Sequence, residues 1–149
     1  MKNIKINIYI FVIITLLFSG CLKDSKLQVN LEKNDQISGN MEAAMSNVSK
    51  DGKYSFGDIV NIDLKAITDT KFMSFDIICN TNNLILTNIK KDGFSDSNFV
   101  SSYQIKNGYR LFFWDLKNNL KKDDNFAKIS LSVRNYGVEN IKIDNFIKE

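Results

Sequence analysis

Apolar and polar residues alternate with a period of two along most of the chain after Tyr54, and this pattern constrains the fold more than any other feature. The clearest run is 127–133, in which apolar residues occupy the odd positions and Lys128, Ser130 and Ser132 occupy the even ones. A period of two is the repeat of a β-strand that buries one face, whereas a helix repeats every 3.6 residues. The chain is therefore predicted to be all-β.

Turn residues separate the alternating runs at intervals of about 8–12 residues, which is typical of an antiparallel sandwich or barrel. The strongest turn signal is Asn107-Gly108, because Asn-Gly between two alternating runs favours a tight hairpin. We expect 41–149 to form a single antiparallel β-sandwich of about eight or nine strands. The polar segment 21–40 is interpreted as a tether. Apolar residues alternate at 27–31, so a short strand within the tether is an alternative.

The amino-terminal segment has the three-part order of an export signal. Lys2 and Lys5 precede an apolar run over 6–18, and Ser19-Gly20 then precede Cys21. The stretch 16–21 resembles the lipobox of bacterial lipoprotein precursors. This resemblance implies that 1–20 is removed as a signal peptide and that lipid is attached to Cys21, which would hold the mature chain at the cell envelope outside the cytoplasm.

Two other interpretations of this segment stay open. A transmembrane anchor needs about 20 apolar residues, whereas the run 6–18 is shorter and contains Asn7 and Thr15. An ordinary secretory signal would also end well at Ser19-Gly20, and its product would be free of lipid.

Charge and composition argue against several classes of function. The net charge is +3, and two of the positive charges lie within 1–20, so the remainder is near neutral and no nucleic acid partner is expected. Histidine is absent, which removes the commonest general base and the commonest zinc ligand. Cys79 is the one cysteine besides Cys21, and we expect it to be a buried apolar side chain. The sequence predicts no enzyme activity, no cofactor and no metal.

Four segments, in order, resemble strands of the cohesin modules found in bacterial cell-surface assemblies. Segment 57–64 reads GDIVNIDL and is similar to the pattern G-D-x-V-x-V-x-V, and segment 126–133 reads FAKISLSV and is similar to F-A-x-I-x-F-x-V. Segments 73–84 and 107–115 resemble two further strands. The resemblance covers roughly 41–147. It implies a jelly-roll-like sandwich that binds a protein partner, for which a dockerin-like module is one candidate.

Apolar residues also fall at positions that are predicted to point outward. If the odd positions of 109–113 face the core, then Arg110, Phe112 and Trp114 face solvent. In the cohesin arrangement this strand neighbours 73–79 on one sheet, and 99–105 flanks it. The residues predicted to bind a partner are Ser74, Asp76, Ile78, Ser102, Gln104, Arg110, Phe112 and Trp114. Alternatively, a loop or the segment 22–50 covers Phe112 and Trp114.

These observations predict a membrane-anchored extracytoplasmic lipoprotein that acts as a non-catalytic protein-binding module. A carbohydrate or cell-wall binder on the same sandwich is an alternative, in which sugars would stack on Trp114 and Tyr103. A structural assembly factor of the envelope is a further alternative.

Overall fold

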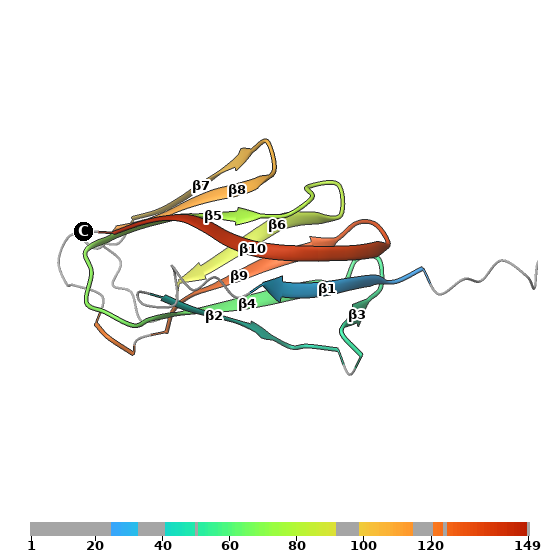
Figure 1. The fold of residues 1–149 in the computed structure, drawn as a ribbon, viewed down its shortest axis with the longest axis horizontal. Helices are drawn as coiled ribbons and strands as arrows, with labels where there is room; N and C mark the ends of the chain where they lie inside the picture. The colour runs from blue at the N-terminus through green and yellow to red at the C-terminus, as the bar shows by residue number, and fades with distance from the viewer. Residues whose placement is uncertain are drawn as a thin grey trace, which may run out of the picture.

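The chain folds as two β-sheets packed face to face, as Figure 1 shows for a computed structural model. The structure describes residues 25–32, 41–49, 51–91, 99–114, 121–123 and 125–148. These residues form ten strands and no helix, so the all-β prediction is confirmed. None of the described residues belongs to a helix that is long and apolar enough to cross a membrane.

Sheet A has six strands and sheet B has four. The order in sheet A is β3 (Lys53–Tyr54), β1 (Leu27–Glu32), β10 (Gly137–Lys148), β5 (Phe72–Ile78), β8 (Gly108–Trp114) and β7 (Phe99–Ile105). The order in sheet B is β2 (Met41–Ser46), β4 (Ile59–Ala66), β9 (Asn125–Val133) and β6 (Leu84–Lys91). All of these neighbours pair antiparallel except β1 and β10, which are parallel.

The core lies between the sheets and contains the apolar residues of the alternating runs. In β4 every second residue from Val60 to Ala66 is fully buried. Phe113 of sheet A lies between Phe75, at 5.7 Å between ring centroids, and Phe126 of sheet B, at 5.2 Å. Full burial of one such side chain contributes about 1.5–3 kcal/mol. The inner face of sheet A is therefore fixed to sheet B, and its outer face is free to carry a site.

The first strand corrects the predicted extent of the tether. Leu27–Glu32 does not belong to a tether, because β1 lies between β3 and β10 in sheet A. Its alternation buries Leu27 and Val29 in the core, and its backbone pairs with both neighbouring strands. The sandwich thus begins no later than Leu27 rather than at residue 41, while Cys21 and its predicted lipid lie outside the described residues.

The predicted tight hairpin between β7 and β8 is confirmed, but its two turn residues are Lys106 and Asn107, and Gly108 begins β8. Gly108 also sets the register of three strands. Gly108 has a φ of +144° and lies opposite Ile105 on one side and Ile78 on the other. A Cβ atom at this position would stand 1.8 Å from the carbonyl oxygen of Ile77. Only glycine allows β8 to approach β5 this closely, and this approach aligns the outward residues of β5, β8 and β7.

Candidate functional site

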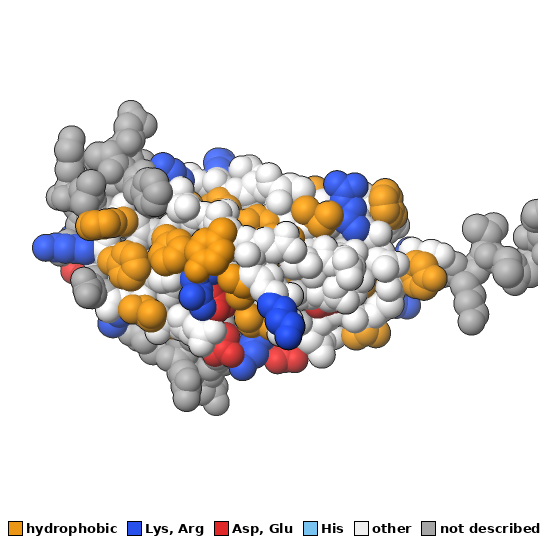
Figure 2. All heavy atoms as spheres, turned by 90° about the horizontal axis from the view of Figure 1, so that it is seen from above, with side chains coloured by type: hydrophobic (Ala, Val, Ile, Leu, Met, Phe, Trp, Pro, Cys, Tyr) orange, Lys and Arg blue, Asp and Glu red, His pale blue; other side chains and the backbone are white. Residues whose placement is uncertain are grey.

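The outer side of sheet A carries a cluster of four aromatic side chains, which we call the aromatic face. Its members are Phe72 of β5, Tyr103 of β7, and Phe112 and Trp114 of β8. Phe72 lies directly opposite Trp114 in the β5–β8 ladder, and their rings meet edge to face at 6.4 Å between centroids. Tyr103 stacks on Phe112 at 5.8 Å. In the view from the side of β7 and β8, Figure 2 shows hydrophobic side chains gathered towards one end, with charged side chains beside them.

The alternation of β8 explains why these rings face outward. Tyr109, Leu111 and Phe113 are buried between the sheets, so Phe112 and Trp114 must lie on the opposite side. This part of the predicted register is confirmed. Trp114 is 49% exposed and Tyr103 is 48% exposed.

The alternative that 22–50 covers these rings does not apply to the described parts of that segment. β1 lies on the far side of β10 from the aromatic face, and β2 is an edge strand of sheet B. The indole of Trp114 therefore keeps about half of its surface open to a ligand.

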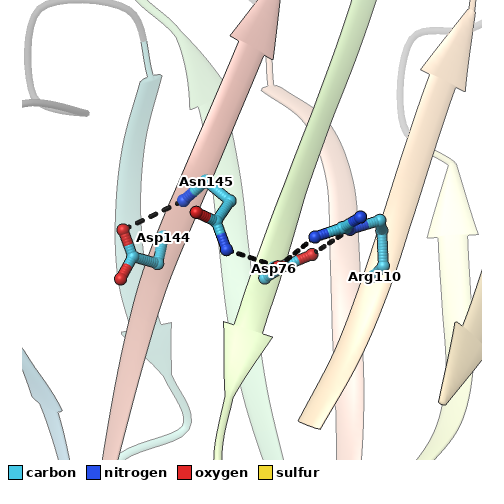
Figure 3. A network of polar contacts seen from close by, with 4 residues as sticks. All are labelled: Asp76, Arg110, Asp144 and Asn145. Carbon is cyan, nitrogen blue, oxygen red and sulfur yellow. Dashed lines mark hydrogen bonds and ion pairs between the residues drawn. The ribbon is translucent and has the colours of Figure 1, made fainter. Parts of the chain in front are cut away.

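A polar network lies on the same side of sheet A, next to the aromatic face (Figure 3). Arg110 Nε and Nη2 donate to the two carboxylate oxygens of Asp76, at 2.5 and 2.7 Å. Asn145 Nδ2 of β10 donates to Asp76 Oδ2 at 2.7 Å, and the backbone N–H of Asn145 donates to Asp144 at 3.0 Å. Lys142 pairs with Asp144 at 2.7 Å. The network thus links β8, β5 and β10 across the sheet.

The electrostatics of the network keep Asp76 and Arg110 charged. The hydrogen bonds from Arg110 lower the pKa of Asp76, although burial opposes this shift. The hydrogen bonds with Asp76 raise the pKa of Arg110, and a hydrogen bond with Tyr103 makes the next largest contribution to this increase. The side chain of Asp76 is 1% exposed and that of Arg110 is 35% exposed. Arg110 can therefore contact a partner, whereas Asp76 acts by holding Arg110 in place.

Two predicted contact residues of β5 are buried. Ser74 and Asp76 do point to the outer side, but they are 4% and 1% exposed. β5 is a central strand, and its outward residues lie below larger neighbours: Phe112 lies opposite Ser74, and Arg110 lies opposite Asp76. Ile78 is half-buried at the other end of β5, opposite Gly108. None of the three belongs to the aromatic face.

Two predicted residues of β7 lie on the wrong side of the sheet. Ser102 is opposite Leu111 and Gln104 is opposite Tyr109, so both share the inward side of sheet A with those buried residues. The outward residue is Tyr103, opposite Arg110. β7 is an edge strand whose inward side stays exposed at Ser102 and Gln104, so the polarity of its residues does not reveal which side faces the core.

Sequence reasoning also missed Phe72 and Asn145. Phe72 could have been found, because it continues the outward positions 74, 76 and 78 of the same strand. Asn145 could not, because it lies in an irregular part of the β10–β5 pairing and has a φ of +51°. Its side chain reaches Asp76 because β10 departs from regular alternation there. Among the described residues, no three acidic or cysteine side chains come together to hold a metal ion.

Comparison with known proteins places this architecture in a class. No protein-family model and no curated protein matches the sequence. The cohesin module of a family 33 glycoside hydrolase from Clostridium perfringens ATCC13124 is similar in structure, with a TM-score of 0.58 and 19% identity over 74% of this chain and 83% of that chain. A chain of the complex between CaDoc0917 and CaCohA2 is similar with a TM-score of 0.51 and 14% identity, over 62% of this chain and 75% of that one. The fold is a cohesin-like β-sandwich.

Proposed function

We propose that this chain is a lipid-anchored, extracytoplasmic binding module that holds a protein partner on the aromatic face and catalyses no reaction. The observation that carries the proposal is the half-exposed pair of rings, Trp114 and Tyr103, on two adjacent strands of sheet A. Both rings pack against further aromatic side chains, so their positions are set before a partner arrives.

The aromatic face has the composition of a protein-binding surface. Trp, Tyr and Arg carry much of the binding energy in protein interfaces, and here Arg110 adjoins Tyr103 and Phe112. A rigid, flat β-surface with an apolar centre and a polar edge loses little conformational entropy on binding. The partner is expected to present a complementary apolar surface with a carboxylate or carbonyl oxygen for the exposed part of Arg110.

The nature of the partner is inferred from the fold class. The resemblance of 57–64 and 126–133 to cohesin strands favours a dockerin-like module, and one of the similar structures, that of CaCohA2, is a complex with CaDoc0917. The anchor is inferred from the lipobox resemblance of 16–21. Two acyl chains on Cys21 would hold the module on a membrane, because a single chain gives only marginal binding.

The decisive experiment uses the purified lipoprotein as bait for proteins of the native culture supernatant, with and without calcium. The captured protein is identified by mass spectrometry, purified and titrated against the bait. Replacement of both Phe112 and Trp114 by Ala is expected to weaken binding at least about 30-fold, which corresponds to about 2 kcal/mol. Ile85→Ala is the matched control, since Ile85 is a 39% exposed apolar residue on sheet B. Equal affinity of the double variant and the control would refute the aromatic face as the site.

Carbohydrate binding is the second candidate, because an indole that is 49% exposed offers a flat ring for a sugar to stack on. Titration with soluble cell-wall glycans distinguishes the two functions. Saturable glycan binding that is lost in Trp114→Ala, without any protein partner, would replace the first proposal.

A further inference from the structure

The exposed large apolar side chains of the described residues fall into two groups. Three of the nine lie on the outer side of sheet A: Tyr103, Trp114 and Ile147. The other six belong to residues that pair or hydrogen-bond near the start of β1 and the end of β9: Val48, Phe56, Ile59, Ile85, Tyr136 and Val138. The proposed function uses Tyr103 and Trp114 of the first group and gives no role to the second. We call residues 55–58 and 134–138, which hold the most exposed members of the second group, the amino-terminal tip.

The amino-terminal tip is built from two turns that are joined by their backbones. The N–H of Gly57 donates to the carbonyl of Val133, and the N–H of Val133 donates to the carbonyl of Asp58, both at 2.9 Å. Arg134 lies over the ring of Phe56, 5.8 Å from its centroid. Phe56 is nevertheless 70% exposed, and Tyr136 is 68% exposed. These rings are therefore held in place by an ordered backbone but remain open to the surroundings.

The start of the sandwich adjoins this tip directly. The N–H of Gly137 donates to the carbonyl of Lys26 at 3.1 Å, and β1 and β10 then run parallel from the Leu27–Gly137 pair. Tyr136 and Val138 flank the glycine that holds Lys26. In Figure 1 the β3–β4 and β9–β10 connections lie at this same end, opposite the carboxyl terminus.

The distance along the chain from the tip to the predicted lipid is short. Cys21 precedes Lys26 by five residues, which span at most about 18 Å when fully extended. Each polar headgroup layer of a bilayer is about 5–8 Å thick. A lipidated Cys21 therefore keeps the tip within reach of the headgroups at all times.

The chemistry of the tip fits that layer. Aromatic side chains concentrate at the boundary between hydrocarbon and water, and basic side chains favour anionic headgroups. The tip has Phe56 and Tyr136 together with Arg134, and Lys26 adjoins them. We propose that Phe56, Tyr136 and Val138 insert into the headgroup layer of the bilayer that holds Cys21, so that the sandwich contacts the membrane through its amino-terminal tip. This inference rests on the lipid anchor of the proposed function.

The test places a polarity-sensitive fluorophore at the tip of the processed, membrane-purified lipoprotein, in the variant Tyr136→Cys. Asn125→Cys is the matched control, because Asn125 is exposed at the start of β9, whose other end leads into the tip. The buried Cys79 is expected to escape labelling in the folded protein. Both proteins are reconstituted into phosphatidylethanolamine–phosphatidylglycerol vesicles that contain a lipid-borne quencher near the headgroups.

We expect quenching at position 136 to exceed quenching at position 125 at least threefold. It should fall towards the control value when Phe56 and Val138 are both changed to Ser. Quenching that persists in that background would overturn the proposal, since the label itself would then be making the contact. Emission at position 136 that is shielded from water without lipid quenching would also overturn it, because a second copy or another protein would cover the tip.

Two results separate the failure of this inference from the failure of the anchor. A protein that floats with the vesicles but is equally water-exposed at positions 136 and 125 overturns the docking and leaves the anchor intact. A protein that does not float with the vesicles overturns both. Neither result bears on partner binding by Phe112 and Trp114, which is measured separately.

Discussion

Asp76 and Arg110 lie directly opposite each other on β5 and β8 and are joined by two hydrogen bonds on the outer side of sheet A. Two apolar-rich strands are thereby held together at a point next to the aromatic face. Because Asp76 is buried and Arg110 is partly exposed, the pair presents a positive group at the surface and hides the negative one.

We expect Asp76→Ala to lower the free energy of unfolding by about 2–3 kcal/mol, because it removes charge-assisted hydrogen bonds from a buried carboxylate. Equilibrium denaturation in urea measures the change. Lys128→Ala is the control, since it removes a pair with Asp63 in which both side chains are more than a third exposed, and such pairs contribute less than about 0.5 kcal/mol. A loss as small as that of the control would show that the pair is not a structural element.

The lowered pKa of Asp76 predicts a specific dependence of stability on pH. The unfolded chain binds a proton at this carboxyl near the ordinary value of 3.8, whereas the folded chain does so only at lower pH. The stabilisation is therefore fully present above about pH 5, decreases once the pH nears the unfolded value of 3.8, and is lost as the pH falls through the folded value. Urea denaturation of the wild type and Asp76→Asn at several pH values between 7 and 2.5 should show a stability difference that shrinks below pH 4. A difference that stays constant over this range would contradict the assignment.

Gly108→Ala should destabilise the fold by at least about 2 kcal/mol, because the new methyl group would collide with the backbone of Ile77 and the φ of +144° disfavours any side chain. Gly57→Ala provides the matched control. Gly57 also has a positive φ, of +86°, but no atom lies within 4 Å of its added Cβ. Thermal unfolding should therefore rank wild type above Gly57→Ala and Gly57→Ala above Gly108→Ala. The reverse order of the two variants would contradict the close approach of β8 to β5.

Cys79 is expected to be inert towards thiol reagents in the folded protein. Burial, reinforced by the nearby charge of Glu139, raises the pKa of its thiol to about 12, so the reactive thiolate is scarce at neutral pH. The rate of reaction with an aromatic disulfide should rise at least about a hundredfold on addition of denaturant, and Cys79→Ser should abolish the signal from this position. Rapid reaction without denaturant would show that the β5–β6 connection opens readily.

The parts of the fold that sequence predicts well are those where one side of a strand is buried. The alternation in β4, β8 and β9 follows the core, so the outward positions of Phe112 and Trp114 could be assigned from the chain alone. The same reasoning fails for β7, because an edge strand has solvent on both sides and Tyr103 packs outward on another ring. Alternation predicts on which side of a sheet a side chain lies, but not how deeply it is buried. The outward orientation of Asp76 was therefore predicted correctly, whereas its exposure to solvent was predicted wrongly.

Other features depend on long-range pairing that no local pattern encodes. β1 was only a possible strand in the sequence, since its alternation is short and its parallel partner lies more than a hundred residues away. Asn145 reaches Asp76 only because of an irregularity in the β10–β5 pairing. The exposed tip residues Phe56 and Tyr136 lie in turns, where the period of two does not apply.

The parallel pairing of β1 with β10 has a mechanical consequence. A pull applied ahead of Leu27 acts along the axis of β1, and its six paired positions against β10 share the load at once instead of peeling apart one by one. Under the proposed function, tension from the lipid anchor would pass sideways through β10 and β5 into β8, which carries Phe112 and Trp114. The parallel pair would thus resist stretching between the proposed anchor and a partner bound on the aromatic face.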